Sequence, residues 1–186
     1  MNGKKMRVLR KIIIAAFVFT LILKVFVCYF PLKYRAEVEK YAAMYGLETE
    51  LVYAVIHTES HFNENSCSSK GASGLMQIMQ PTADWAAEQI GIENYSYERI
   101  YEPEINIQIG CWILSKLADV YDNDIVLICA AYNAGMGNVS KWLGDERFSS
   151  DGKTLSCIPF EETKNYVAKV TVCSRVYGII NELKFA

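Results

Sequence analysis

The sequence predicts a mainly α-helical protein, in which one apolar helix near the N-terminus precedes a single helical domain. Its 186 residues, 52% hydrophobic and 22% charged, are enough to bury one core. Residues 12–23 form an uncharged, mostly apolar run that can be the first part of a membrane-spanning helix. Beyond residue 30, apolar residues recur at helical spacing between glycine and proline boundary signals.

The first thirty residues are basic and then apolar, which predicts a signal anchor across the cytoplasmic membrane. Residues 1–30 contain six Lys or Arg and no acidic residue. The 19 residues from Ile12 to Phe30 just span a hydrocarbon core, and the ammonium of Lys24 lies near enough to its far end to reach the interface. The basic flank favours a single pass with the N-terminus in the cytoplasm and the domain on the extracytoplasmic side. A cleaved signal and a buried core helix are the alternatives.

The predicted domain, residues 31–186, is acidic, and its composition excludes some function classes. It contains 13 basic and 21 acidic residues, a balance that does not suit a nucleic-acid partner. Two histidines and no Cys-x-x-Cys pair argue against a metal site, and we expect no cofactor. Three cysteines, Cys111, Cys129 and Cys173, are expected in the core. A Cys67–Cys157 disulfide is left open.

Two helices should begin the domain, at residues 33–45 and 48–60. Gly46 suits the left-handed position that ends a helix, and acidic residues in the first turn of the second helix favour its dipole. Residues 63–74 are rich in Asn, Ser and Gly, so this segment is expected to be a loop.

Five further helices are expected, and local signals mark their ends. Proline is favoured in a first turn, glycine after a last turn and aspartate at an N-cap. These signals are Pro81, Gly91, Pro103 and Asp124. The expected helices span residues 82–90, 103–121, 124–131, 137–143 and 161–183. Residues 144–160 form the longest irregular stretch.

Glu59 stands out before any comparison with known families. Val52, Val55 and Ile56 form an apolar stripe on the second helix of the domain, and Glu59 continues the same face. A carboxyl group at the edge of a core loses solvation of its charged form, so its pKa should rise above about 4.3. Such a group could protonate a glycosidic oxygen. The alternative is an ordinary last-turn glutamate that points into water.

Four ordered segments resemble the signature blocks of the Slt-type lytic transglycosylases, whose fold is similar to goose-type lysozyme. The first block, residues 59–83, includes Gly74-Leu-Met-Gln-Ile-Met79. The other blocks are residues 103–110, Ala131-Tyr-Asn-Ala-Gly135 with its continuation to residue 139, and residues 162–167. The resemblance implies a lysozyme-like helical domain that acts on peptidoglycan. Four blocks in order are more specific than any one short motif.

The resemblance also implies a mechanism with one acid/base. Glu59 would protonate the oxygen that joins N-acetylmuramic acid to N-acetylglucosamine through a β-1,4 bond. It would then take a proton from the C6 hydroxyl of the muramic sugar, which attacks its own C1. The product would be a 1,6-anhydro sugar, formed without water, by a carbon–oxygen lyase.

Seven further residues match positions that the family uses around the substrate. Ser68 would bond Glu59 or an acetamido group, and the others would line the groove. They are Ser68, Gln77, Met79, Tyr132, Asn133, Glu162 and Tyr166. Structural alternatives stay open for several of them: Met79 as core, Tyr132 as a buried tyrosine, Asn133 as a turn residue and Glu162 as a helix N-terminal acid.

Two alternative functions remain after the resemblance is taken into account. A hydrolytic muramidase would need a second carboxylate, for which Glu64, Glu161 and Glu162 are candidates. A catalytically silent wall-binding scaffold, as part of a cell-wall or secretion machine, is the alternative from another class. Residues 144–160 should decide whether cutting is exo or endo, because they could close one end of the groove.

Overall fold

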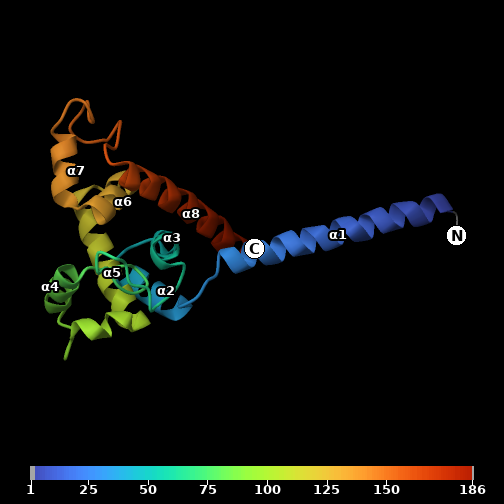
Figure 1. Cartoon of the computed structure of the whole chain (residues 1–186), viewed down its shortest axis with the longest axis horizontal. Coiled ribbons are helices and arrows are strands. Elements are labelled where there is room, and N and C mark those ends of the chain that lie inside the picture. Colours follow the sequence, from blue (N-terminus) through green and yellow to red (C-terminus); the bar gives the residue numbers. More distant parts are fainter. Residues whose placement is uncertain (1–2, 186) are drawn as a thin grey trace. The chain divides into compact units, whose positions relative to one another are not determined.

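The computed structural model describes the backbone of residues 3–185, in which helices are joined by loops and no regular strand occurs (Figure 1). The mainly α-helical fold class is therefore confirmed. The elements are α1 (Gly3–Tyr29), α2 (Arg35–Met44), α3 (Thr49–Ser60), α4 (Gln80–Ile90), a 3-10 helix η1 (Tyr97–Tyr101), α5 (Pro103–Val120), α6 (Ile125–Ala134), α7 (Met136–Leu143) and α8 (Glu161–Phe185).

The chain divides into two units, residues 1–33 and residues 34–186. Within the first unit, Arg10–Tyr29 has a mean hydropathy of 2.6, and among the described residues it is the one segment long and apolar enough to cross a membrane. Its apolar side chains are exposed to solvent, with Phe17 at 70% and Phe19 at 67%. A lipid environment would cover this apolar surface.

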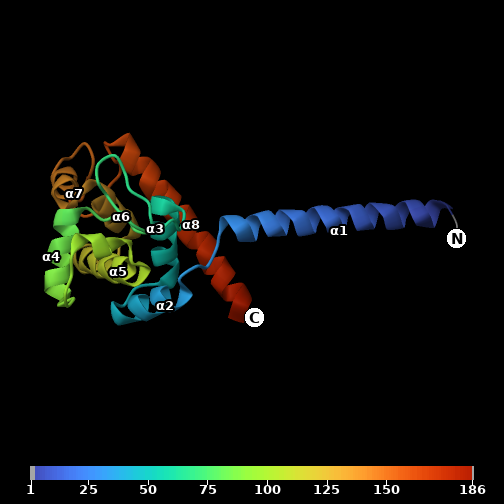
Figure 2. The same ribbon diagram turned by 60° about the horizontal axis from the view of Figure 1, so that its bottom comes forward.

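The core of the second unit is built around α3, which packs most extensively against α8 (Figure 2). Val52, Val55 and Ile56 on α3 are fully buried, as their spacing predicts, and so is Tyr177 on α8. The ring of Tyr177 stacks on Tyr53 of α3 with a centroid distance of 5.1 Å. α5 and α6 complete the core, because α5 contacts α2, α4 and α6, and α6 also contacts α8.

Most predicted helix ends are close to the observed ones, and their signals act as expected. Gly46 and Gly91 adopt left-handed φ angles of 67° and 76°. The Oδ1 atom of Asp124 accepts hydrogen bonds from the amides of Val126 and Leu127, which caps α6.

Two local predictions were wrong. The sequence pattern predicts no element at η1, because its five residues bury only Ile100 and so present no helical period. Helix α6 continues to Ala134 instead of ending at residue 131, because its chain stays helical until Gly135 takes a φ of 84° and a ψ of 146°.

The cysteines follow the prediction that most of them belong to the core. Cys111 and Cys129 are buried, and Cys173 is half-buried. Cys67 and Cys157 are exposed and free, so the structure contains no disulfide between them.

Candidate active site

Glu59 lies in the last turn of α3, immediately before the chain reverses. His61 and Phe62 both adopt left-handed φ angles, 51° and 63°, which end the helix. Such angles are unfavourable for residues with a Cβ, so packing must hold them. Phe62 supplies this packing, because it is 3% exposed and its ring lies 6.2 Å from that of Tyr53. Glu59 is thereby placed where the core meets the following loop.

The carboxyl group of Glu59 is electrostatically unusual. Its pKa is raised from 4.5 to about 7, chiefly by burial and also by the negative charge of Glu162. The hydroxyl of Tyr166 opposes this shift by interacting with the ionised carboxylate, although it does not reach regular hydrogen-bonding geometry with any described group. Near neutral pH, Glu59 is therefore divided between its protonated and ionised forms.

Two tyrosines surround Glu59 with neutral hydroxyl groups. Burial, followed by the charge of Glu59, raises the pKa of both Tyr132 and Tyr166 well above 10. The hydroxyl of Tyr132 donates a hydrogen bond of 2.9 Å to the carbonyl oxygen of Met76. Both phenols therefore remain protonated when Glu59 changes its charge.

Residues 61–79 form the loop between α3 and α4, and Asn106 of α5 holds its centre. The side chain of Asn106 is fully buried. Its Oδ1 accepts from the amide of Met76 at 2.8 Å, and its Nδ2 donates to the carbonyl oxygens of Ser73 and Ile100. Gly74 passes beside it so closely that a Cβ would overlap the Asn106 amide. The 61–79 loop is thus attached to α5 through a buried polar group.

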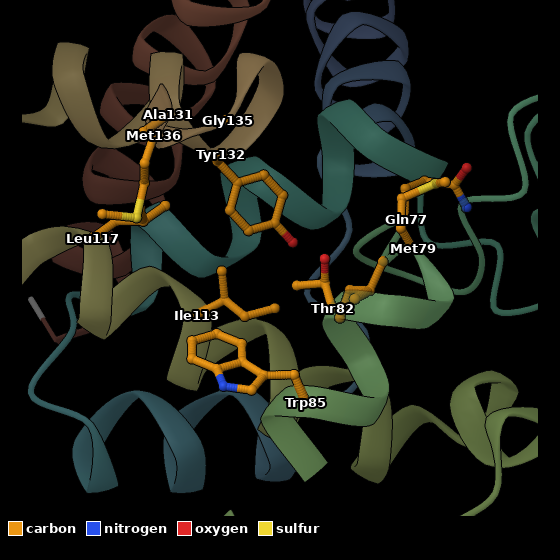
Figure 3. Close-up of a pocket in the computed structure, with 11 residues that line it drawn as sticks. Gln77, Met79, Thr82, Trp85, Ile113, Leu117, Ala131, Tyr132, Gly135 and Met136 are labelled. Atoms are coloured by element: carbon orange, nitrogen blue, oxygen red, sulfur yellow. The ribbon is translucent and has the colours of Figure 1, made fainter. Parts of the chain in front are cut away.

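A cleft of about 330 Å³ lies between this loop and helices α4, α5 and α6 (Figure 3). It is mostly apolar, and Figure 3 shows Trp85 and Ile113 on one side and the Tyr132 hydroxyl turned toward Thr82. The lining residues are Gln77, Ile78, Met79, Thr82, Trp85, Ile113, Leu117, Ala131, Tyr132, Gly135 and Met136. Glu59 is not part of this lining. Tyr132 joins Glu59 to the cleft, because Tyr132 lines the cleft and its pKa is raised in part by the charge of Glu59.

The predicted site residues fall into two groups. Gln77, Met79 and Tyr132 line the cleft, and Met79 is 42% exposed. Tyr132, Tyr166 and Glu162 act on Glu59 or respond to its charge. The Glu162 side chain is 74% exposed and its Oε2 lies 3.7 Å from the Nζ of Lys70.

Ser68, Gln77 and Asn133 have structural contacts of their own. The hydroxyl of Ser68 accepts from the amide of Ala72 at 3.0 Å. The Nε2 of Gln77 donates to the carbonyl oxygens of Ser66 and Gly74, within the 61–79 loop. Asn133 Oδ1 accepts from the Thr163 hydroxyl at 2.7 Å, which links α6 to α8. These bonds leave the hydroxyl proton of Ser68 and the amide group of Asn133 to interact with a ligand.

Several residues that shape the site carry no functional signal in the sequence. Asn106 could have been noticed as a lone amide among the buried residues Ile105, Ile107 and Ile109. Trp85 is 52% exposed, but only the fold shows that it faces a cleft. Met136 joins the lining through the turn at Gly135. Periodicity treats such residues as core or surface and cannot place them in a groove.

Comparison with known proteins identifies the family to which this helical domain belongs. The family described as "Transglycosylase SLT domain" matches residues 37–154. The chain belongs to this family, which confirms the resemblance seen in the sequence.

Named relatives and solved structures agree. The chain is 35% identical over 150 residues to the soluble lytic murein transglycosylase of Escherichia coli K12, covering 80% of this chain and 23% of that protein. It is 32% identical over 168 residues to the membrane-bound lytic murein transglycosylase C of Yersinia pestis, covering 78% of this chain and 46% of that protein.

The fold matches an inactive glutamate-to-glutamine mutant of the lytic transglycosylase Slt of Pseudomonas aeruginosa. The TM-score is 0.74 at 34% identity, over 82% of this chain and 25% of that chain. The chain therefore spans a quarter to a half of the length of these relatives.

Proposed function

We propose that this chain cleaves the β-1,4 bond between N-acetylmuramic acid and N-acetylglucosamine in peptidoglycan without consuming water. Glu59 serves as the single acid/base, and the muramic sugar is left as its 1,6-anhydro form. The observation that carries this proposal is the pKa of Glu59, which burial raises to about 7. The names of the relatives support it, since they are lytic murein transglycosylases.

The first step needs a carboxylic acid that still holds its proton at neutral pH. The raised pKa of Glu59 meets this requirement. The proton passes to the glycosidic oxygen, the bond to C1 breaks, and the N-acetylglucosamine side leaves with its oxygen protonated. The carboxylate that remains is poorly solvated, so it is a stronger base than an exposed glutamate.

In the second step this carboxylate removes the proton of the C6 hydroxyl, and the C6 oxygen bonds to C1. The proton of the C6 hydroxyl restores the protonated form of Glu59, so the cycle closes without a water molecule or a second carboxylate. Between the two steps, Tyr166 stabilises the ionised carboxylate of Glu59, because its hydroxyl interacts with that form. Tyr132 holds the 61–79 loop beside the reacting group through Met76.

The substrate would lie along the cleft, with its sugar faces on apolar side chains. Two apolar residues that line the cleft, Trp85 and Met79, are 52% and 42% exposed and so are open to contact with a sugar. Polar groups of the sugar would bond to the polar candidate substrate-binding residues, Ser68, Gln77, Tyr132, Asn133, Glu162 and Tyr166, and Met79 would contact the sugar through its apolar side chain. Because both the domain and the wall polymer are acidic, short-range contacts must account for recognition.

We also propose that residues 1–30 form a basic stub and a membrane anchor, and that residues 31–186 form the catalytic domain outside the cytoplasmic membrane. The apolar segment Arg10–Tyr29 and the basic residues before it support this topology. One relative, the Yersinia pestis enzyme, is named as membrane-bound. In this location the domain faces the peptidoglycan.

The experiment is mass spectrometry of the soluble products that the full-length protein in mild detergent releases from purified peptidoglycan. We expect disaccharide-peptides one water lighter than hydrolysis products, and none from Glu59→Gln. Glu161→Gln is the matched control, because Glu161 is an exposed glutamate at the start of α8 whose carboxylate pairs with Lys164. Its product pattern should equal that of the parent.

Other outcomes would separate the alternatives. Products of full mass with reducing ends would indicate a hydrolytic muramidase, and Glu162→Gln would then test the carboxylate whose charge reaches Glu59. Equal release by Glu59→Gln and the parent would refute the assignment of Glu59. No release from any wall preparation would favour the scaffold function.

A further inference from the structure

The C-terminal half of α8 has apolar residues on two opposite faces. One face belongs to the core, where Val170 and Tyr177 are fully buried. The other consists of Val172, Val176, Ile179 and Leu183, which we call the α8 outer stripe. Spacings of four, three and four residues place these four on one side of the helix.

The α8 outer stripe is exposed in the second unit. Val172, Ile179 and Leu183 are 58%, 56% and 73% exposed, and Val176 is half-buried. Single exposed apolar residues are common in soluble proteins, but a continuous stripe along one helix face marks an interaction surface. The two α8 residues that act on Glu59, Glu162 and Tyr166, lie near the start of the helix, whereas the stripe begins at Val172.

The charges beside the stripe fit an anionic membrane surface. Lys169 and Arg175 are exposed and lie on the two flanks of the stripe, about one sixth of a helical turn to either side. Glu182 is the acidic residue near its end. Cationic side chains on both flanks of an apolar stripe are typical of helices that lie in the membrane interface, because their stems bury while their heads reach phosphates.

The C-terminal half of α8, which carries the stripe on its outer face, is also close to the point where the domain begins. The charge of Arg35, the first residue of α2, affects the pKa of Tyr53, and the Tyr53 ring stacks on Tyr177 of α8. Figures 1 and 2 both show the start of α2 near the C-terminal half of α8. Only residues 30–33 separate the end of α1 from Tyr34, a connector that spans at most about 18 Å. A membrane that holds Arg10–Tyr29 thus lies within this distance of the domain's first residue.

We propose that the α8 outer stripe rests in the outer interface of the membrane, as a second contact that orients the domain on its anchor. This inference depends on the proposed anchor and not on the proposed reaction. The occupant is the lipid surface, because the short connector holds that surface close and the flanking cations match its phosphates.

Quenching of tryptophan fluorescence by brominated lipids tests this contact. Full-length protein is reconstituted into nanodiscs of phosphatidylcholine and phosphatidylglycerol with brominated acyl chains, one copy per disc. The signal of the parent, which has three tryptophans, is subtracted from that of each variant. Ile179→Trp reports on the stripe and Val18→Trp on the anchor. Gln89→Trp, at an exposed position of α4, is the matched control outside both.

We expect Val18→Trp to be strongly quenched, Ile179→Trp to lose at least half as much signal, and Gln89→Trp to lose none. Quenching of Val18→Trp without quenching of Ile179→Trp would overturn the α8 contact and leave the anchor intact. If Val18→Trp is not quenched, both the anchor and this inference are wrong.

A second copy of the chain is the competing occupant of the stripe. If the Ile179→Trp environment changes only in discs that hold two copies, the stripe is a dimer interface and the lipid proposal is overturned. Cleavage of soluble glycan fragments by the same variants reports on the reaction separately. Because Ile179 lies outside the candidate active site, this activity should equal that of the parent, whichever result the quenching gives.

Discussion

The two longest irregular segments of the helical domain, residues 61–79 and residues 144–160, are held in different ways. The 61–79 loop is bonded to α3, α5, α6 and η1, for example from the Ser60 hydroxyl to the carbonyl oxygen of Leu75 at 2.7 Å. In residues 144–160, the described side-chain hydrogen bonds stay within the segment. Asp151 alone accepts from the amides of Lys153 and Thr154.

This difference predicts different roles for the two segments. A loop attached to four elements can hold reacting groups to a fixed geometry, which catalysis requires. A segment whose side-chain hydrogen bonds stay within it can change its sequence without disturbing the core. We therefore expect the 61–79 loop to fix the chemistry and residues 144–160 to influence where along the glycan cutting occurs.

The largest expected effect comes from Gly74→Ala. Gly74 has a φ of 79°, and an added Cβ would overlap the Asn106 amide and lie 2.6 Å from the Ile100 carbonyl oxygen. Backbone strain and overpacking together should lower the free energy of unfolding by about 4 kcal/mol. Gly152→Ala, the matched control, has a φ of 67° but its nearest contact is at 3.8 Å, so it should cost only about 1 kcal/mol.

Urea unfolding of the full chain in detergent, followed by circular dichroism, measures both variants. Equal losses for Gly74→Ala and Gly152→Ala would mean that the two segments are held equally tightly, which would contradict the difference in their hydrogen bonding.

The next effect is expected from Asn106→Ala. This change removes three hydrogen bonds and leaves the Met76 amide and the Ile100 carbonyl oxygen without their partners, whereas the Ser73 carbonyl oxygen still accepts from the Ile78 amide. The loss should be about 3 kcal/mol of unfolding free energy, and kcat should fall because the loop loses its attachment. Asp151→Ala, in the exposed part of residues 144–160, should change neither quantity by as much. If Asp151→Ala were the more damaging variant in the same unfolding assay, the assignment of the two segments would be reversed.

The sequence predicted the helices and Glu59 because both depend on short-range patterns. The apolar stripe of α3 fixes which face is buried, and Glu59 follows on that face. Tyr132 was matched by motif, but its bond to Met76 joins residues 56 positions apart. Asn106 likewise depends on three partners from the 61–79 loop and η1. Such contacts arise only when the helices have packed, so no local pattern could predict them.

Glu59 gives the third prediction, because it should make stability fall as pH rises. Its pKa is about 7 in the folded chain and 4.5 as an ordinary glutamate, so the folded state holds the proton more firmly. This contribution is fully present below pH 4.5 and is lost as the pH rises to about 7. Glu59→Gln removes this dependence and should stabilise the protein at pH 8 by at most about 3 kcal/mol, with little difference at pH 4.

The contribution of Asp151, in residues 144–160, to stability should have the opposite pH dependence. Backbone amides of Thr154 and Lys153 hold the pKa of Asp151 below its usual range, so its contribution is lost as the pH falls. Chemical denaturation at several pH values compares Glu59→Gln, Asp151→Asn and the parent. Parallel pH curves for Glu59→Gln and the parent would show that Glu59 is not desolvated in the folded protein.

The smallest effect is expected from Lys70→Met, at the ion pair that joins the 61–79 loop to the start of α8. The Lys70 Nζ lies 3.7 Å from Glu162 Oε2, and both side chains are more than 70% exposed. Water and salt screen such a pair, so the unfolding free energy should change by less than about 0.5 kcal/mol. Because Glu162 raises the pKa of Glu59, losing the nearby cation should move the alkaline limb of the pH–rate profile slightly upward at low salt. Added salt should abolish this shift. A loss of stability as large as that of Asn106→Ala would instead show that the surface pair, and not the buried amide, holds the loop in place.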